Sequence, residues 1–181
     1  MNSMGTCAEK TAKDFSITRE DQDEFAINSY KKAAAAWSSG AFKAEVCPVT
    51  IPDRRAPVTV SEDEEYKNIK FDKIKSLNTV FVRDGSGTIT AANASNINDG
   101  ASAVVLMSRE KADEVGAKPL ARIVAFADGA QAPIDFASAP ANKAIPAALK
   151  RAGLQASDIS LWEVNEVRKT CMCSSRVVDP R

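Results

Sequence analysis

The sequence contains no histidine among its 181 residues. Histidine is the usual general base of acyl-transfer chemistry and the commonest metal ligand, so neither role can be filled by an imidazole within these residues. Cysteine is also sparse, with Cys7, Cys47, Cys171 and Cys173. They do not form two pairs at zinc-finger spacing, so we expect reduced thiols and no structural zinc.

An excess of either charge is missing as well. Lysine plus arginine and aspartate plus glutamate both number 24, so the formal net charge is +0. This balance gives no reason to expect a nucleic-acid partner or an anionic membrane surface. No apolar run approaches the roughly 20 residues that span a bilayer, and the N-terminal segment MNSMGTCAEK shows no targeting pattern. We therefore expect neither a nucleic-acid nor a membrane partner.

The first half of the chain predicts a long helix over residues 19–38. Thr18 is a good N-cap with Asp21 three residues on, and residues 26, 30, 33 and 37 are apolar or aromatic at helical spacing. Gly40 can end this helix. A short helix is predicted over residues 8–14.

Residues 46–63 are β-rich but interrupted by Pro48, Pro52 and Pro57, which predicts edge or irregular strands. The acidic residues 62–65 that overlap the end of this stretch predict a solvated loop. Lysines then gather at 67, 70, 73 and 75. A short strand over 79–82 and a turn over 84–87 are predicted next.

From residue 88 the pattern changes to α/β. Small residues fill 88–100, and small side chains allow close backbone approach. Strands are predicted over 101–107, 121–127 and 159–164. Between them, a helix runs from the cap Ser108 to Gly116 and another over 142–152 ends at Gly153. We expect the α/β layers to begin here, the earlier half to form a separate α+β module, and residues 167–181 to be disordered.

Five segments resemble, in order, the biosynthetic (acetoacetyl-CoA) thiolases. They are MGTCAEKTA, REDQDEFAINSYKKAAAAW, TITAANASNINDGASAVVLM, ARIVAFADGA and WEVNE, between Met4 and Glu166. The resemblance implies a partial thiolase fold of the α/β class. It places the coenzyme A-binding loop domain at 1–95, the end of the N-terminal half at 96–125, the start of the C-terminal half at 126–166, and a divergent tail at 167–181.

The resemblance also implies a set of site residues. Ser95 matches a serine beside the pantetheine arm of coenzyme A, and Tyr30 matches a tyrosine that contacts both cofactor and a potassium ion. The remaining matches are Asn68, Ile69, Lys70 and Lys73 at the nucleotide end, the potassium-facing carbonyls of Ala91, Ala92 and Ala94, and Asn165 for an oxyanion-hole water. Without the resemblance, Tyr30 is more often a core residue, the lysines a solvated face, and the small residues a packing device.

The family reaction is the condensation of two acetyl-CoA to acetoacetyl-CoA, which needs a nucleophilic cysteine, a histidine and a second cysteine. None of the four cysteines matches a catalytic one, Ser3 stands where the family usually has histidine, and Val167 begins an unrelated segment. We expect a truncated chain that is inactive alone and retains coenzyme A affinity.

Two other readings stay open: a module that joins full-length thiolase subunits, since the family is tetrameric, or a translation or gene-model product without function. The resemblance implies a mitochondrial location, with the cytoplasm as the alternative. We also expect residues 96–166 to fold marginally, because the apolar strands would expose edges and faces.

Overall fold

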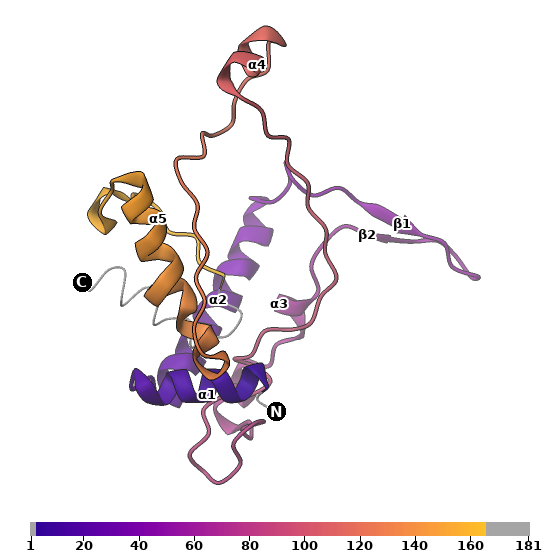
Figure 1. The fold of residues 1–181 in the computed structure, drawn as a ribbon. Coiled ribbons are helices and arrows are strands. Elements are labelled where there is room, and N and C mark those ends of the chain that lie inside the picture. Colours follow the sequence, from indigo (N-terminus) through magenta and orange to yellow (C-terminus); the bar gives the residue numbers. More distant parts are fainter. Residues whose placement is uncertain (1–2, 166–181) are drawn as a thin grey trace.

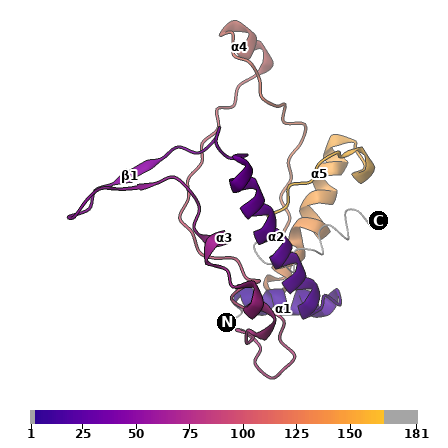
Figure 2. The same ribbon diagram turned by 180° about the vertical axis from the view of Figure 1, so that it is seen from behind.

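The computed structural model describes residues 3–165. Helix α1 (Met4–Asp14) lies across one end of the long helix α2 (Arg19–Ser39), as Figure 1 shows. A β-hairpin projects to one side of α2, and α4 (Arg109–Glu114) lies at the tip of a long excursion of the chain. Figure 2 shows the same arrangement from behind.

Both N-terminal helices begin at side-chain caps. The Ser3 hydroxyl accepts from the Thr6 amide, so α1 begins at Met4, four residues earlier than the predicted start at residue 8. Thr18 and Asp21 form a reciprocal capping box, in which each side chain accepts from the backbone N–H of the other. Gly40, at φ 73°, ends α2 in the left-handed conformation that glycine adopts without strain. The predicted long helix is confirmed.

The proline-interrupted region forms one antiparallel hairpin, β1 (Val49–Ile51) and β2 (Val58–Val60). Val49 pairs with Val60 and Ile51 with Val58, and all six strand residues are exposed. The predicted edge character is confirmed, because each strand lies on an edge of this two-stranded sheet. Helix α3 (Glu65–Asn68) and a 3-10 helix, η1 (Phe71–Ser76), follow, so the predicted acidic loop ends inside a helix.

The short strand predicted over 79–82 is wrong. These residues form a bend in which the Thr79 hydroxyl donates to the Val82 carbonyl. Val80 N–H donates to the Ile89 carbonyl at 2.9 Å, a single contact rather than a ladder. The predicted turn after it is confirmed by the Asp84 carboxylate, which accepts from the Ser86 amide at 2.9 Å.

The strands predicted over 101–107, 121–127 and 159–164 are also wrong within the described residues. None of the three segments forms a ladder, and the first is exposed throughout. Strand propensity becomes a strand only when a neighbour takes up the N–H and C=O groups. The two chain segments that flank α4, which include residues 101–107 and 121–127, are called its limbs below. They lie apart from each other in both views, so neither supplies a strand neighbour for the other (Figures 1 and 2). The helix capped by Ser108 is confirmed, although it is shorter than predicted.

The C-terminal part returns the chain to α1. The 3-10 helix η2 (Pro133–Ser138) packs on α1, where the Cys7 thiol donates to the Pro133 carbonyl and Lys10 pairs with Asp135 at 2.6 Å. A π-turn, η3 (Pro140–Ala144), leads into α5 (Ile145–Ala152), which ends at Gly153 as predicted. A single 3-10 turn, η4 (Ala156–Asp158), follows.

The interior is small and contains few large apolar side chains. The buried apolar residues are Cys7, Ala8, Ala12, Ile17, Ala26, Ile74, Ile89, Ala92, Ala112 and Ala141. Most of them belong to α1, α2, η1 and residues 89–92, so packing is concentrated where these segments meet. The expected exposure of the later apolar segments is confirmed, with Val105 85% and Phe126 73% exposed. Within residues 3–165, no helix combines the length and hydropathy needed to cross a bilayer.

Candidate functional site

A single stripe of α2 faces the segments that carry the predicted cofactor residues. Arg19, Asp23, Ala26 and Tyr30 follow one another at spacings of four, three and four, which places them on one face of a helix. Ala26 is fully buried, so this face is the packed one. Helices α3 and η1 both contact α2.

Arg19 fastens η1 to the start of this stripe. Its Nε donates to the Asp23 carboxylate at 2.7 Å, and its terminal nitrogen donates to the carbonyls of Ile74 and Leu77 at 3.1 and 3.0 Å. The planar guanidinium can serve a carboxylate and two carbonyls at once, which a lysine could not do with the same geometry. Lys73 belongs to η1 and is thereby held beside α2, with its side chain exposed.

Asp23 fastens the small-residue segment to the same stripe. Its second oxygen accepts from Asn93 Nδ2 at 3.0 Å. Asn93 also donates to the Thr88 carbonyl at 3.0 Å and accepts from the Thr90 amide at 2.8 Å. Asp23 and Asn93 are 3% and 1% exposed, so these bonds are shielded from water and fix the turn over residues 90–94.

Helix α1 holds the other end of this segment through Glu9. The carboxylate accepts from the Thr88 amide at 2.9 and 3.1 Å, from the Thr88 hydroxyl at 2.8 Å and from the Ile89 amide at 3.0 Å. Residues 88–94 are therefore held from both N-terminal helices by charged side chains, which make stronger hydrogen bonds than neutral ones.

The turn itself presents the residues predicted to bind ligands. Ser95 and Ala91 are exposed, Ala94 is half-buried and Ala92 is buried. Within residues 3–165, no hydrogen bond ends on the carbonyl oxygens of Ala91 or Ala92. The neighbouring Thr90 hydroxyl is buried and also has no partner among the described residues. A buried hydroxyl without a partner is uncommon in protein interiors, and carbonyl and hydroxyl oxygens are ligands that a hard cation prefers.

Tyr30 lies two helical turns beyond Asp23 on the same stripe and is half-buried. Burial raises the pKa of its phenol, and the carboxylate of Glu65 on α3 raises it further. The phenol is therefore neutral at physiological pH. Asn68 ends α3, Ile69 and Lys70 follow it, and of these three only Ile69 is half-buried. Glu65 therefore places α3 near Tyr30, and the connection that follows α3 leaves the Lys70 side chain in solvent.

The stripe of α2 thus contacts three segments that carry predicted site residues. Arg19 holds η1, which contains Lys73, and Asp23 holds the turn that precedes Ser95. Helix α3, which precedes the connection at 68–70, lies near Tyr30. Asn165 is different: it is exposed at the end of the described residues, in an extended segment. The predicted disordered tail at 167–181 lies outside the described residues.

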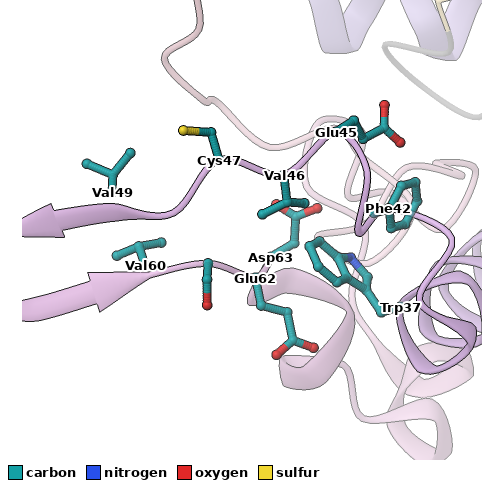
Figure 3. Close-up of a pocket in the computed structure, with 10 residues that line it drawn as sticks. Trp37, Phe42, Glu45, Val46, Cys47, Val49, Val60, Glu62 and Asp63 are labelled. Atoms are coloured by element: carbon teal, nitrogen blue, oxygen red, sulfur yellow. The ribbon is translucent and has the colours of Figure 1, made fainter.

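A hollow of about 300 Å³ opens at the other end of α2, between the helix end and the hairpin (Figure 3). None of the predicted site residues lines it. Trp37 and Phe42 form one wall, while Glu45, Glu62 and Asp63 supply carboxylates and no basic residue is present. This lining disfavours a phosphate-bearing ligand, so the hollow is not the predicted cofactor site.

Sequence reasoning missed Arg19, Asp23, Asn93 and Glu9. A detectable signal existed for the first two: an Arg–Asp pair at i, i+4 falls on the stripe that also carries Ala26 and Tyr30, where an apolar pair would be expected. Asn93 stood among small residues with nothing to mark it as buried. Glu9 resembled any surface carboxylate of an amphipathic helix.

Comparison with known proteins identifies the family of the chain. The thiolase N-terminal domain model matches residues 1–110, and the thiolase C-terminal domain model matches residues 117–177. The mitochondrial acetyl-CoA acetyltransferase of Bos taurus is 58% identical over 164 residues, which are 90% of this chain and 38% of the relative. That of Danio rerio is 56% identical over 164 residues, 90% of this chain and 39% of its own length.

Solved structures give the same result. The Acat5 thiolase from Ascaris suum, in complex with coenzyme A, superposes with a TM-score of 0.88 at 47% identity, over 98% of this chain and 45% of that one. The acetyl-CoA acetyltransferase of Bacillus anthracis superposes with a TM-score of 0.85 at 39% identity, over 96% of this chain and 43% of that one. The chain spans less than half the length of these proteins, and it belongs to the thiolase family with a partial thiolase fold.

Proposed function

We propose that these residues form the coenzyme A-binding portion of an acetyl-CoA acetyltransferase, and that they do not condense acetyl-CoA by themselves. The observation that carries the first part is the likeness to the coenzyme A-bound Ascaris thiolase over 98% of this chain. The exposed position of Ser95 directly after the held turn and the exposed lysines of the α3–η1 region agree with it.

The proposed ligand lies along the stripe of α2. Its pantetheine arm passes Ser95 and Tyr30, and its nucleotide end lies beside Asn68, Ile69, Lys70 and Lys73. Lysine ammonium groups suit the phosphates of the cofactor as mobile point charges. A potassium ion would be held by the carbonyls of Ala91, Ala92 and Ala94 with the Tyr30 hydroxyl, where the unpartnered Thr90 hydroxyl adds a further oxygen. The ion would order the turn that presents Ser95.

The proposal that the chain is inactive alone rests on the surroundings of its described cysteines and on the lack of a histidine to activate them. Cys7 is buried and donates to the Pro133 carbonyl, so it cannot reach an acyl group without breaking α1 from η2. Cys47 is exposed on the lining of the hollow, which contains no lysine, arginine or histidine to activate a thiol. No imidazole is available in the sequence to activate either thiol. Asn165 alone can orient a water but cannot start acyl transfer.

Titration of coenzyme A into the purified chain, with and without potassium chloride, tests the binding proposal, and a thiolysis assay on acetoacetyl-CoA tests inactivity. We expect potassium-sensitive binding without turnover. Lys73→Met should weaken binding, whereas Lys118→Met, another exposed lysine in the limb after α4, should not. Equal binding by both variants would remove Lys73 from the site, and measurable turnover would refute the inactivity proposal.

A second function, association with full-length thiolase subunits, is favoured by the exposed limbs around α4. Val104, Val105 and Leu106 are 80%, 85% and 69% exposed, and Ile123, Val124 and Phe126 continue the exposure on the other limb. Burying each such side chain is worth about 1.5–3 kcal/mol, and the unpaired backbone offers strand edges. The occupant proposed is the remainder of the thiolase fold, supplied by another thiolase chain.

Co-purification with a full-length acetyl-CoA acetyltransferase tests this second function. Val105→Lys should abolish co-purification, while Leu154→Lys, at a less exposed apolar residue after α5, should leave it intact. Absence of any complex at micromolar concentrations would reject this function without affecting the coenzyme A proposal. Because relatives carry mitochondrial names, we also propose the mitochondrion as the compartment, testable by organelle fractionation.

A further inference from the structure

The Asp23 carboxylate is the point at which two parts of the proposed site meet. One oxygen accepts from Arg19, 2.7 Å away, and the other from Asn93, 3.0 Å away. Arg19 continues to the carbonyls of Ile74 and Leu77, while Asn93 continues to Thr88 and Thr90. The helix that carries Lys73 and the turn that leads to Ser95 are therefore joined through one side chain.

This carboxylate cannot release either partner cheaply. Asp23 is only 3% exposed, and a buried charge must keep its hydrogen-bond partners because water cannot replace them. Arg19 is similarly constrained, with its side chain 19% exposed. A displacement of η1 would pull Arg19 away from Asp23. The Asp23 carboxylate would then shift, and this would disturb the hydrogen bond from Asn93 to its other oxygen. The two segments consequently hold a common spacing.

We infer that Asp23 is a positioning residue that sets the distance between the nucleotide-contacting and pantetheine-contacting parts of the coenzyme A site. The inference rests on the proposed function and adds to it a residue that does not touch the cofactor. A ligand held at two points gains the full benefit of both only when their spacing matches its own length. Through Arg19, Asp23 constrains the position of the helix that contains Lys73. Through Asn93, it constrains the turn that precedes Ser95.

The Arg19 contacts and the Asn93 contacts can be removed separately. Each removal should affect only one part of the cofactor, which a general loss of stability would not do. Coenzyme A, 3′,5′-ADP and pantetheine are the probes, with weak binding followed by saturation-transfer NMR. Arg19→Lys keeps the charge but loses the two carbonyl bonds, so it should weaken coenzyme A and 3′,5′-ADP and spare pantetheine. Asn93→Ala should weaken coenzyme A and pantetheine and spare 3′,5′-ADP.

Asp23→Asn should weaken coenzyme A by at most roughly a hundredfold, the limit reached if the whole free energy of a lost bond to a charged group appears in the affinity. Asp113→Asn is the matched control, because Arg109–Asp113 is also an Arg–Asp pair at i, i+4 but is exposed on α4. It should leave all three affinities unchanged. Circular dichroism spectra and thermal unfolding show which variants are folded.

The outcomes distinguish failure of the coenzyme A function from failure of the positioning role of Asp23. A wild-type chain that binds none of the probes overturns both the coenzyme A function and this inference. A wild-type chain that binds, with Arg19→Lys and Asn93→Ala each weakening all probes equally, overturns the positioning role alone. If Asp23→Asn does not fold, Arg19→Lys and Asn93→Ala carry the test. If none of the three folds, the network supports the fold only and the inference is overturned.

Discussion

Replacing Glu9 with glutamine removes the charge that fastens α1 to residues 88 and 89. The carboxylate accepts from two backbone amides and one hydroxyl, at distances between 2.8 and 3.1 Å. Glutamine keeps one acceptor oxygen, but its amide nitrogen is a donor that would face a backbone N–H. Hydrogen bonds to charged groups are worth about 1.5–3 kcal/mol each, so with part of the contact retained we expect a loss of about 2–3 kcal/mol.

Urea unfolding followed by circular dichroism measures this loss as a change in the free energy of unfolding. For a chain of this length, the same loss corresponds to a fall in Tm of roughly 5–10 °C. Glu114→Gln is the control: Glu114 pairs with Lys111 across α4, with both side chains more than half exposed, and should change stability by less than about 0.5 kcal/mol. If Glu9→Gln were as mild as the control, the carboxylate would not be holding residues 88–94 in place.

Three further predictions follow from local geometry. A Cβ at Gly87 would lie 2.1 Å from the Val82 carbonyl oxygen, so Gly87→Ala should lower Tm clearly, whereas Gly100→Ala, where nothing lies within 4 Å, should not. Hydrogen bonds to Asp135 and Asp14 raise the pKa of Lys10 from 10.5 to about 12. The pKa of Lys10 is higher in the folded state, so its ion pairs stabilise the fold fully below pH 10.5 and this stabilisation is lost as pH rises through about 12. Unfolding measured across this pH range should therefore show a stability difference between wild type and Lys10→Met that disappears at higher pH. Absorbance at 295 nm should show both tyrosines ionising above pH 10, and Glu65→Gln should lower the midpoint of the Tyr30 transition; an unchanged midpoint would show that Glu65 has no effect on the phenol.

Elements fixed by neighbours in the sequence could be predicted, and elements fixed by distant segments could not. Helix α2 depends on Thr18, Asp21 and Gly40, which act within a turn of its ends, so its bounds are nearly those predicted. Ser108 and Gly153 identify α4 and α5 for the same reason. Start and stop signals of this kind act within the first or last turn of a helix, so they can be recognised without knowing the rest of the fold.

The strands failed because a strand is defined by what lies beside it. Residues 101–107 and 121–127 are apolar and β-branched, but within the described residues neither finds a ladder partner. In the hairpin, Val49 and Val60 pair because a short connection brings them together, and there the prediction succeeded. The apolar limbs show that composition gives a preference for extended backbone, and that the sheet itself is a tertiary property.

The candidate site divides in the same way. The resemblance predicted roles for Ser95 and Tyr30, which lie inside two of the matching segments, and for Lys73, which lies between those segments; all three side chains are partly or fully exposed. It did not identify the side chains that place them. Those contacts span 70 residues between Asp23 and Asn93 and 55 between Arg19 and Ile74, and no local pattern encodes such pairs.

The size of the core explains why polar side chains carry this task. Near α1 the packed cluster consists of Ala12 and Ile17 with Phe15 against it, and such small apolar surfaces tolerate sliding. Hydrogen bonds are directional, so the half-buried Arg19 and the buried Asp23 and Asn93 fix the register of segments that apolar contacts would leave loose. The proposed two-point coenzyme A site would need that register, since an error of about an ångström in the position of a contacting group is costly. Volume-conserving changes at Ile17 should therefore be milder for ligand binding than the isosteric Asp23→Asn, because the first alters packing and the second alters position.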